Sequence, residues 1–374
     1  MRFPEFNGEW KSITLGEICK LQTGSKDTQD KIQDGKYPFY VRSNTIEKID
    51  SYSFDEEAIL TSGDGAGVGK IYHLVNGKFD LHQRVYALTK FDTNFSIKFV
   101  YHFFSEKFYK RVMRLSAKNS VDSVRRDMIF KMKMPYPKIY EQNKISSFLT
   151  LLDDRINTQN KIIENLQVQL TNLSHKIFTQ EIRFKSENES NFPEWKEKEL
   201  KYFCSFYSGG TPKSTNKSYY LGDIPFIGSG NISDDSVDSF ITDEALKSSS
   251  AKLVNEGDLL YALYGATSGE VAISKISGAI NQAVLCIKTT QNKEYLFYLL
   301  KNSKNRIVQT FIQGGQGNLS TKIVKELKFS FPCLEEQTKI ASFLSLIDEK
   351  LMNEMAVLKN LTDQKKYLLQ QLFI

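Results

Sequence analysis

A glycine-rich segment from Ser62 to Lys70, SGDGAGVGK, contains the residue types of a phosphate-binding loop. The pattern G-x-x-x-x-G-K-[ST] cradles phosphates with backbone N–H groups and ends in a hydroxyl residue that holds Mg²⁺. In this chain Asp64 stands where the first glycine is required, and Ile71 stands where the hydroxyl residue is required. We therefore expect a tight hairpin, or a loop that another backbone approaches closely, and no nucleotide site.

The four cysteines and four histidines offer no catalytic or metal-binding constellation. The cysteines stand singly, without a C-x-x-C pair, and no two histidines have metal-ligand spacing. The sequence therefore predicts no zinc site, no disulfide framework and no catalytic residue. We expect the cysteines to be reduced and mostly buried.

Polar and basic side chains gather on the predicted loops and suit a different kind of chemistry. Arginine, lysine, asparagine and glutamine carry the forks and amides that match base edges and phosphates, so these loops are candidates for reading DNA. The candidates are Gln22, Thr23, Lys26, Arg42, Asn44, Lys70, Gln83 and Arg84 in the first half of the chain, Thr211, Lys213, Ser229, Asn231, Tyr264, Thr267 and Gln282 in the second half, and Lys118, Arg125 and Lys322 in the loops before two long predicted helices. For each single residue, a loop that only faces water remains the alternative.

Composition limits the partners and the compartment. The formal net charge is +6, which permits a polyanionic partner without requiring one. No run of about 18 uncharged apolar residues occurs, and the first residues lack the layout of a signal peptide. We therefore expect a cytoplasmic protein that does not bind membranes.

The chain has 374 residues, and the elements that position these side chains occur in two similar copies along it. Trp10 and Trp195 each follow a Phe-Pro-Glu sequence, and Pro137 and Pro332 each precede a closely similar helical stretch. Within that stretch, KISSFLTLLDDRI stands beside KIASFLSLIDEKL. The sequence therefore predicts a tandem duplication of one globular unit plus one helix.

Each globular unit is expected to be α+β. Short β-rich runs such as YPFYV and DIPFIG, separated by glycine turns, lead into helical segments. The expected divisions are a first recognition domain over residues 1–137, a helical spacer over 138–182, a second recognition domain over 183–332 and a second spacer over 333–374.

Apolar residues recur in each spacer at alternating steps near three and four, which predicts two long helices that pair through their apolar seams. Each run lacks proline and glycine and has about 38 residues, or roughly 57 Å at 1.5 Å per residue. Because the first helix leaves domain one for domain two, facing seams require antiparallel packing, with the domains at opposite ends of a rod, an approximate two-fold axis and neighbouring termini. The expected seam comprises Phe148, Leu149, Leu152, Ile156, Ile163, Leu166 and Leu170 in the first helix, and Phe343, Leu344, Ile347, Leu351, Leu358 and Leu361 in the second. Ordinary amphipathic helices, each lying on its own domain, are the alternative.

Three strings resemble a known family: SGGTPKSTN with the following IGSGNI, GGQGNLSTKIVKE, and the pattern P-x-x-x-EQ-x-K-I-x-S-F-L-x-x-x-D, which occurs twice. Over essentially its full length the chain resembles the specificity subunit of type I restriction-modification enzymes. The resemblance implies two target recognition domains, each reading one half of a gapped, asymmetric site in double-stranded DNA.

The resemblance also implies partners. Methyltransferase subunits, two per chain, would dock along the helices, where the seam residues are candidates for docking, and restriction subunits would join for cleavage. S-adenosylmethionine, ATP and Mg²⁺ would be bound by those partners and not by this chain. The chain itself lacks the N/D-P-P-Y/F signature of adenine methyltransferases.

Two other functions are compatible with the repeat. A tethering scaffold would bind proteins with its two units, and lack of salt-dependent DNA affinity in the assembled complex would favour it. A stand-alone DNA enzyme would require turnover by the purified chain, although no catalytic residues converge in the sequence.

Overall fold

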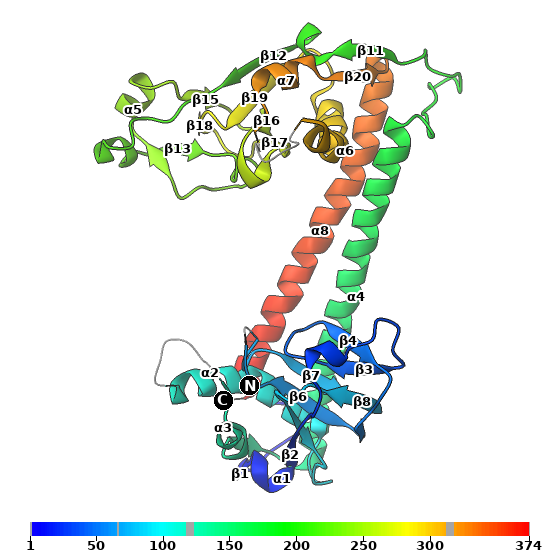
Figure 1. The fold of residues 1–374 in the computed structure, drawn as a ribbon, viewed down its shortest axis with the longest axis vertical. Coiled ribbons are helices and arrows are strands. Elements are labelled where there is room, and N and C mark those ends of the chain that lie inside the picture. Colours follow the sequence, from blue (N-terminus) through cyan, green and yellow to red (C-terminus); the bar gives the residue numbers. More distant parts are fainter. Residues whose placement is uncertain (1, 66, 117–122, 312–317, 374) are drawn as a thin grey trace. The chain divides into compact units, whose positions relative to one another are not determined.

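The computed structural model describes residues 2–65, 67–116, 123–311 and 318–373. The chain divides into two compact units, and Figure 1 marks both of its ends in unit 1. Unit 1 comprises Met1–Lys161 and Met355–Ile374, and unit 2 comprises Ile162–Glu354. Near the two ends, the rings of Trp10 and Phe373 both contact Phe99, with centroids 6.0 and 5.3 Å away. The predicted proximity of the termini is thus confirmed.

Within its described residues, unit 1 contains two four-stranded sheets and one strand pair. Its strands are β1 (Lys11–Thr14), β2 (Lys20–Thr23), β3 (Tyr37–Tyr40), β4 (Ile46–Ile49), β5 (Phe54–Asp55), β6 (Ala58–Ser62), β7 (Tyr72–Val75), β8 (Lys78–Leu81), β9 (Val85–Thr89) and β10 (Lys133–Tyr136), and its short helices are α1 (Leu15–Ile18), η1 (Thr28–Asp30), α2 (Ile97–Leu115) and α3 (Arg126–Phe130). The sheet orders are β2-β9-β6-β7, which is antiparallel throughout, and β4-β3-β8-β5, in which β3 and β8 are parallel. β1 pairs with β10.

Unit 2 repeats this topology strand for strand. Its strands are β11 (Lys196–Glu199), β12 (Cys204–Ser208), β13 (Ile224–Ile227), β14 (Phe240–Ile241), β15 (Lys252–Val254), β16 (Leu259–Ala262), β17 (Val271–Ile273), β18 (Gly278–Ile280), β19 (Val284–Thr289) and β20 (Lys328–Phe331). Its helices, besides the long ones, are η2 (Leu200–Tyr202), η3 (Lys217–Tyr220), α5 (Asp243–Lys247), η4 (Gly265–Thr267), α6 (Lys293–Phe311) and α7 (Thr321–Glu326). The orders β12-β19-β16-β17 and β14-β13-β18-β15 match those of unit 1, and β11 pairs with β20. The predicted duplication of an α+β unit is confirmed.

One close backbone approach is common to both units. A Cβ atom on Gly24 would lie 1.9 Å from the carbonyl oxygen of Leu81, and one on Gly209 would lie 1.7 Å from that of Ile280. Both glycines follow the first strand of the antiparallel sheet, where the chain crosses to the second sheet. Only glycine fits there, because any side chain would overlap the carbonyl group.

The two long helices are α4 (Ile139–Phe178), with 40 residues, and α8 (Leu334–Leu372), with 39 residues. Each begins shortly after a proline, Pro137 or Pro332, which suits the start of a helix because proline lacks the N–H group that the first turn leaves unpaired. At 1.5 Å per residue each helix is about 60 Å long. The predicted long, uninterrupted helices are confirmed.

The ends of the two helices pair within each unit. In unit 1, Leu149 in the first turns of α4 shares a core with Leu372 in the last turn of α8. In unit 2, Leu344 in the first turns of α8 shares a core with Ile177 in the last turn of α4. Each helix therefore starts where the other ends, which is the predicted antiparallel arrangement.

The expected seam residues take three kinds of place. The core of unit 1 contains Phe148, Leu149 and Leu152, and the core of unit 2 contains Leu170, Phe343, Leu344 and Ile347. Between the cores, the buried residues are Ile163 and Leu166, and the half-buried ones are Ile156, Leu351, Leu358 and Leu361. The first turns of each helix thus lie on the core of the unit they leave, as the alternative of ordinary amphipathic helices expected, while their last turns pack in the core of the other unit.

The glutamate of the repeated EQ motif in unit 1 is a buried anchor. Glu141, whose side chain is 2% exposed, accepts hydrogen bonds from Arg2 Nε and Nη2, both at 2.7 Å. It also accepts one from Trp10 Nε1 at 3.3 Å. The bidentate pair and the indole tie the chain's first residues to the start of α4.

Unit 2 contains the same anchor at the start of α8. Glu336 is fully buried and accepts from Arg183 Nε at 3.2 Å and Nη2 at 2.7 Å, and from Trp195 Nε1 at 3.0 Å. The neighbouring glutamine of the motif acts on the backbone: Gln142 accepts from the N–H of Ser96, and Gln337 from that of Asn292, just before α2 and α6. The motif therefore fixes the helix starts.

In the part of the chain that the structure describes, no helix is long and apolar enough to cross a membrane.

Candidate nucleic-acid interface

Four loops of unit 1 meet at one edge of its two sheets. The registers pair Thr23 with Tyr86, Ser62 with Val85 and Tyr40 with Leu81, so β2, β3, β6 and β8 all end, and β9 begins, at this edge. Backbone hydrogen bonds join the loops, from His82 N–H to Tyr40 and from Gln83 N–H to Lys26. We call this surface edge 1, and it comprises residues 24–27, 41–45, 63–65, 67–71 and 82–84.

Edge 1 is charged, and one of its carboxylates pairs with two arginines. The carboxylate of Asp64 lies between two arginines, with Oδ1 3.2 Å from Arg42 Nη1 and Oδ2 3.7 Å from Arg84 Nε. A second carboxylate, that of Asp27, accepts a hydrogen bond at 3.1 Å from Gln83 Nε2. Arg42, Arg84 and Gln83 are therefore oriented by neighbouring carboxylates.

His82 lies beneath these charges and is 2% exposed. Its Nδ1 accepts the backbone N–H of Arg84 at 2.9 Å, so this nitrogen is unprotonated. Burial, followed by the nearby charge of Arg42, lowers the pKa of His82 below its ordinary value. The imidazole is thus neutral at pH 7 and supports the loop before β9 as a hydrogen-bond acceptor.

Unit 2 contains the corresponding surface, edge 2, at residues 209–213, 228–231, 263–270 and 281–283. Its backbone hydrogen bonds repeat those of edge 1: Leu263 N–H donates to Ala283, and Leu319 N–H to Leu263, as Gly63 N–H donates to Arg84 and Val124 N–H to Gly63. In both units the segment before the short helix α3 or α7 thus joins the edge.

Edge 2 lacks arginine and carries amides, hydroxyls and two charged residues, Lys213 and Glu270, of which Glu270 pairs with Lys304. Thr211 Oγ1 donates to Gln282 Oε1 at 2.6 Å, and Asn231 Nδ2 donates to Asp234 Oδ2 at 2.9 Å. The sequence of unit 2 contains two arginines, and neither lies at this edge. Arg183 holds Glu336, and Arg306 packs over the ring of Phe329.

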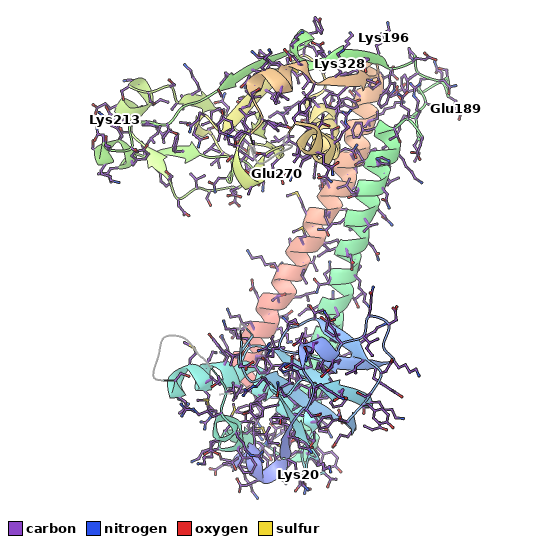
Figure 2. The ribbon with its side chains drawn as sticks, in the orientation of Figure 1. Lys20, Glu189, Lys196, Lys213, Glu270 and Lys328 are labelled. Carbon is purple, nitrogen blue, oxygen red and sulfur yellow. The ribbon has the colours of Figure 1, made fainter. Side chains whose placement is uncertain are left out.

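The structure brings most of the predicted DNA-binding residues to these two edges. Thr23, Lys26, Arg42, Asn44, Lys70, Gln83 and Arg84 lie at edge 1 or at the strand end beside it, and Thr211, Lys213, Ser229, Asn231, Tyr264, Thr267 and Gln282 lie at edge 2. Figure 2 places Lys213 at the end of unit 2 away from Lys196 and Lys328, which lie in β11 and β20.

The other predicted residues lie elsewhere. Gln22 lies within β2 and accepts a hydrogen bond from Thr89 Oγ1 at 2.9 Å. Arg125 and Lys322 are exposed at the starts of α3 and α7, beside the segments that join the edges. Lys118 lies outside the described residues.

The glycine-rich segment forms the hairpin between β6 and β7. Gly65 and Gly69 have φ angles of +75° and +64°, and Gly265 and Gly269 of the second unit have +81° and +83°. The Gly69 N–H donates to Ser62, as the Gly269 N–H donates to Ala262. A strand follows each loop, whereas a phosphate loop leads into a helix, so the predicted hairpin is confirmed.

Sequence reasoning missed the acidic residues of edge 1. Asp64 was noticed only because it breaks the phosphate-loop pattern, and Asp27 and His82 carried no signal, since their roles depend on loops that are distant in sequence. In the described part of the chain, no group of three or more His, Cys, Asp or Glu residues could hold a metal ion.

Comparisons with known proteins agree with this geometry. A family model, the type I restriction modification DNA specificity domain, matches residues 7–168 and 193–362. The chain is 25% identical over 379 residues to the type I restriction enzyme MjaVIII specificity subunit of Methanocaldococcus jannaschii, an alignment that covers 93% of this chain and 87% of that protein. It is 27% identical over 193 residues to the type I restriction enzyme EcoDI specificity subunit of Escherichia coli, covering 50% of this chain and 42% of that protein. The chain thus spans less than half of the second relative.

Solved structures share the fold. The crystal structure of the type-I restriction-modification system S subunit from M. genitalium has a TM-score of 0.68 at 19% identity, and the match covers 100% of this chain and 99% of that one. A structure described as the structural basis underlying complex assembly and conformational transition of the type I R-M system has a TM-score of 0.58 at 14% identity, covering 99% and 98%. Because the family model matches both halves, the chain belongs to the type I restriction-modification DNA specificity family, whose curated members above are specificity subunits.

Proposed function

We propose that the chain reads a bipartite, gapped site in double-stranded DNA, one half with each unit. The observation that carries this proposal is that edges 1 and 2 occupy the same place in the repeat, on the same backbone hydrogen bonds, but present different side chains. Two copies of one reader with different contacts suit two different half-sites. The recognition domains would extend over residues 1–137 and 183–332.

The helical spacers, residues 138–182 and 333–374, would set the gap between the half-sites. Each helix is continuous over about 60 Å, with its first turns in the core of one unit and its last turns in the core of the other. Half-sites contacted from one face of the duplex lie about 34 Å apart, or one helical turn. Inserting one heptad in both helices should lengthen the preferred gap, and an unchanged gap would contradict this role.

Methyltransferase subunits would dock on surfaces of α4 and α8 that the chain itself leaves uncovered. Leu149 and Leu344 are fully buried in their own cores and have no surface to offer. Leu151 and Leu346, which are equivalent in the repeat, are 67% and 65% exposed. Equivalent apolar surfaces in the two copies suit two identical partners, hence two methyltransferase subunits per chain.

Docking can be tested by counting partners. Leu151→Ser or Leu346→Ser should each reduce the number of bound methyltransferase subunits from two to one, and the double variant should bind none, as measured by native mass spectrometry. Val168→Ser, which changes another exposed apolar residue of α4 several turns away, is the matched control. Retention of two subunits by both single variants would exclude these leucines as docking residues.

The remaining parts of the enzyme would be supplied by the partners in the cytoplasm. S-adenosylmethionine would bind to the methyltransferase subunits, and ATP and Mg²⁺ to restriction subunits that join through them. This chain would contribute recognition alone, as the paired, non-catalytic side chains of its edges suggest.

The experiment for the proposed function is co-expression with the cognate methyltransferase subunit in a methylation-free host, followed by single-molecule sequencing for N6-methyladenine. A gapped, two-part methylation motif that disappears when this chain is omitted supports the proposal and identifies both half-sites. Methylation that persists without the chain would exclude it, and would favour the tethering scaffold instead.

A further inference from the structure

Asp64 lies beside two arginines at edge 1, and their geometry indicates which DNA base they recognise. We propose that Arg42 and Arg84 are guanine-reading side chains positioned by Asp64, so that the half-site bound by unit 1 is specified in part through guanine. The inference rests on the proposed function, since it assumes that edge 1 meets DNA.

The geometry favours a base edge over a phosphate. An arginine fork matches the O6 and N7 atoms of guanine in the major groove, which is the commonest specific contact between proteins and DNA. Arg84 directs Nε toward Asp64 and therefore keeps its two terminal nitrogens for such a contact. Arg42 bonds Asp64 through Nη1 and keeps Nε and Nη2, the other edge of its fork. A carboxylate 3.2–3.7 Å from both guanidinium groups offsets part of their charge and would repel a phosphate.

Asp64 is itself held firmly, as a positioning residue must be. Ser62 Oγ, which is buried, donates to the backbone oxygen of Asp64 at 2.9 Å. The preceding residue, Gly63, donates its N–H to the carbonyl oxygen of Arg84 at 2.7 Å and accepts from Val124 N–H at 2.7 Å. The carboxylate and one of its arginines are thus fixed to the same backbone, which reduces the conformational entropy lost on binding.

The two arginines themselves remain accessible. Arg42 and Arg84 side chains are 43% and 67% exposed, whereas Asp64 is 25% exposed beneath them. The carboxylate is therefore covered by the arginines, and the guanidinium groups form the outer surface.

Unit 2 provides an internal control. Both of its arginines are engaged away from edge 2, and the residue at the place of Asp64 in the repeat is Tyr264. The half-site read by unit 2 must therefore be specified without arginine. Substitutions at Asp64, Arg42 and Arg84 should accordingly affect only one half of the methylation motif.

The test uses the chain in complex with its methyltransferase and measures N6-methyladenine motifs by single-molecule sequencing. Arg84→Gln and Arg42→Gln should each reduce the preference for guanine at one position of one half-site by about tenfold or more, because a bidentate contact discriminates to that extent. Asp64→Asn should relax the same positions while the other half-site and total methylation at the original motif change little. Arg114→Gln, an exposed change of equal charge on α2, is the control and should leave the motif unchanged.

Several results would overturn the inference. If the variants weaken methylation equally at all sequences and lower the salt dependence by about one charge, the arginines contact phosphates. If the motif is unaltered in all three variants, the arginines do not read bases. These outcomes still leave a chain-dependent motif and hence the proposed function. If no motif depends on the chain at all, the proposed function fails and this inference fails with it. Arg84 is largely exposed, so its variant tests the idea even if Asp64→Asn misfolds.

Discussion

Units 1 and 2 anchor their long helices with the same types of side chain. The loops at the edges of their sheets, edge 1 and edge 2, carry different side chains. Arg2, Trp10 and Glu141 are matched by Arg183, Trp195 and Glu336, with the same hydrogen bonds in each unit. At the edges several backbone bonds are repeated too, yet edge 1 groups two arginines around the carboxylate of Asp64, whereas edge 2 has no arginine and pairs Thr211 with Gln282. The duplicated chain has thus kept the groups that hold the frame and changed those that face outward.

The difference follows from what each group must do. A buried carboxylate tolerates little change, because it needs its cation and its hydrogen bonds to offset desolvation. An edge whose loops are joined by backbone hydrogen bonds keeps its shape whatever side chains it carries. Recognition can therefore change at the edges without loss of the fold.

Removal of the anchoring glutamate should cause the largest loss of stability. Glu336→Ala and Glu141→Ala should each lower the free energy of unfolding of their own unit by about 3–5 kcal/mol, because each removes a buried carboxylate that accepts three hydrogen bonds, worth about 1–3 kcal/mol apiece. The two tryptophans of the chain belong to different anchors, so fluorescence can separate the units during denaturant unfolding. Trp10→Phe leaves Trp195 to report on Glu336→Ala, and Trp195→Phe leaves Trp10 to report on Glu141→Ala.

The exposed neighbour Glu335 supplies the control for this prediction. Glu335→Ala should change the unfolding free energy by less than about 0.5 kcal/mol. A large effect in one unit and a small effect in the other would mean that the two anchors are equivalent in geometry but not in energy.

Substitution of the two closely approached glycines should cause the next largest loss of stability. Gly24→Ala and Gly209→Ala should each cost about 3 kcal/mol, because the added Cβ would overlap a carbonyl oxygen and the strands must separate. Gly265→Ala is the control, since its Cβ meets no atom within 4 Å and only the φ of +81° opposes it, at about 1 kcal/mol. Equal losses in all three variants, measured by denaturant unfolding, would show that backbone strain and not the close approach decides the cost.

The sequence predicted the frame more fully than the edges. The duplication, the α+β units and the antiparallel helices follow from patterns that are local or repeated, such as the spacing of leucines and the EQ motif. The pairing of Asp64 with Arg42 and Arg84 does not, because it depends on three loops brought together by strand register. Seam periodicity also could not separate Leu149, which packs in a globular core, from Ile156, which is only half-buried.

Where the long helix meets the globular unit, the two units place different side chains beside the same aspartate. His102 in α2 lies 3.9 Å from Asp153, whereas Tyr298 in α6 bonds Asp348, the equivalent aspartate, at 3.0 Å. Burial lowers the pKa of His102 from 6.5 to about 4; Asp153 opposes this, while Lys365 and Lys98 add to it.

The difference predicts that unit 1 is the acid-sensitive one. Between pH 6.5 and about 4 the unfolded chain binds a proton at His102 that the folded unit does not. The free energy of unfolding of unit 1 therefore decreases as the pH is lowered, by up to roughly 3 kcal/mol. His102→Tyr should flatten this dependence when unfolding of unit 1 is followed by Trp10 fluorescence from pH 4 to 7. An unchanged slope would assign the acid sensitivity to other groups.

The smallest effect concerns the helix seam. Lys365 in α8 forms an ion pair with Asp153 in α4, and leucine, Leu170, stands at its place in the other helix. Lys365→Leu would make the two seams alike. The stability of unit 1 should change by less than about 1 kcal/mol, because the leucine adds buried apolar area that offsets the lost ion pair, and water still reaches Asp153, which is 28% exposed. The pKa of His102 is the more sensitive readout. Lys365 lowers it, so the variant should raise it, as an NMR titration of the chain's four histidines would show. A pKa that stays unchanged would mean that Lys365 is too well screened by water to act on His102, and that this difference between the units has no electrostatic consequence.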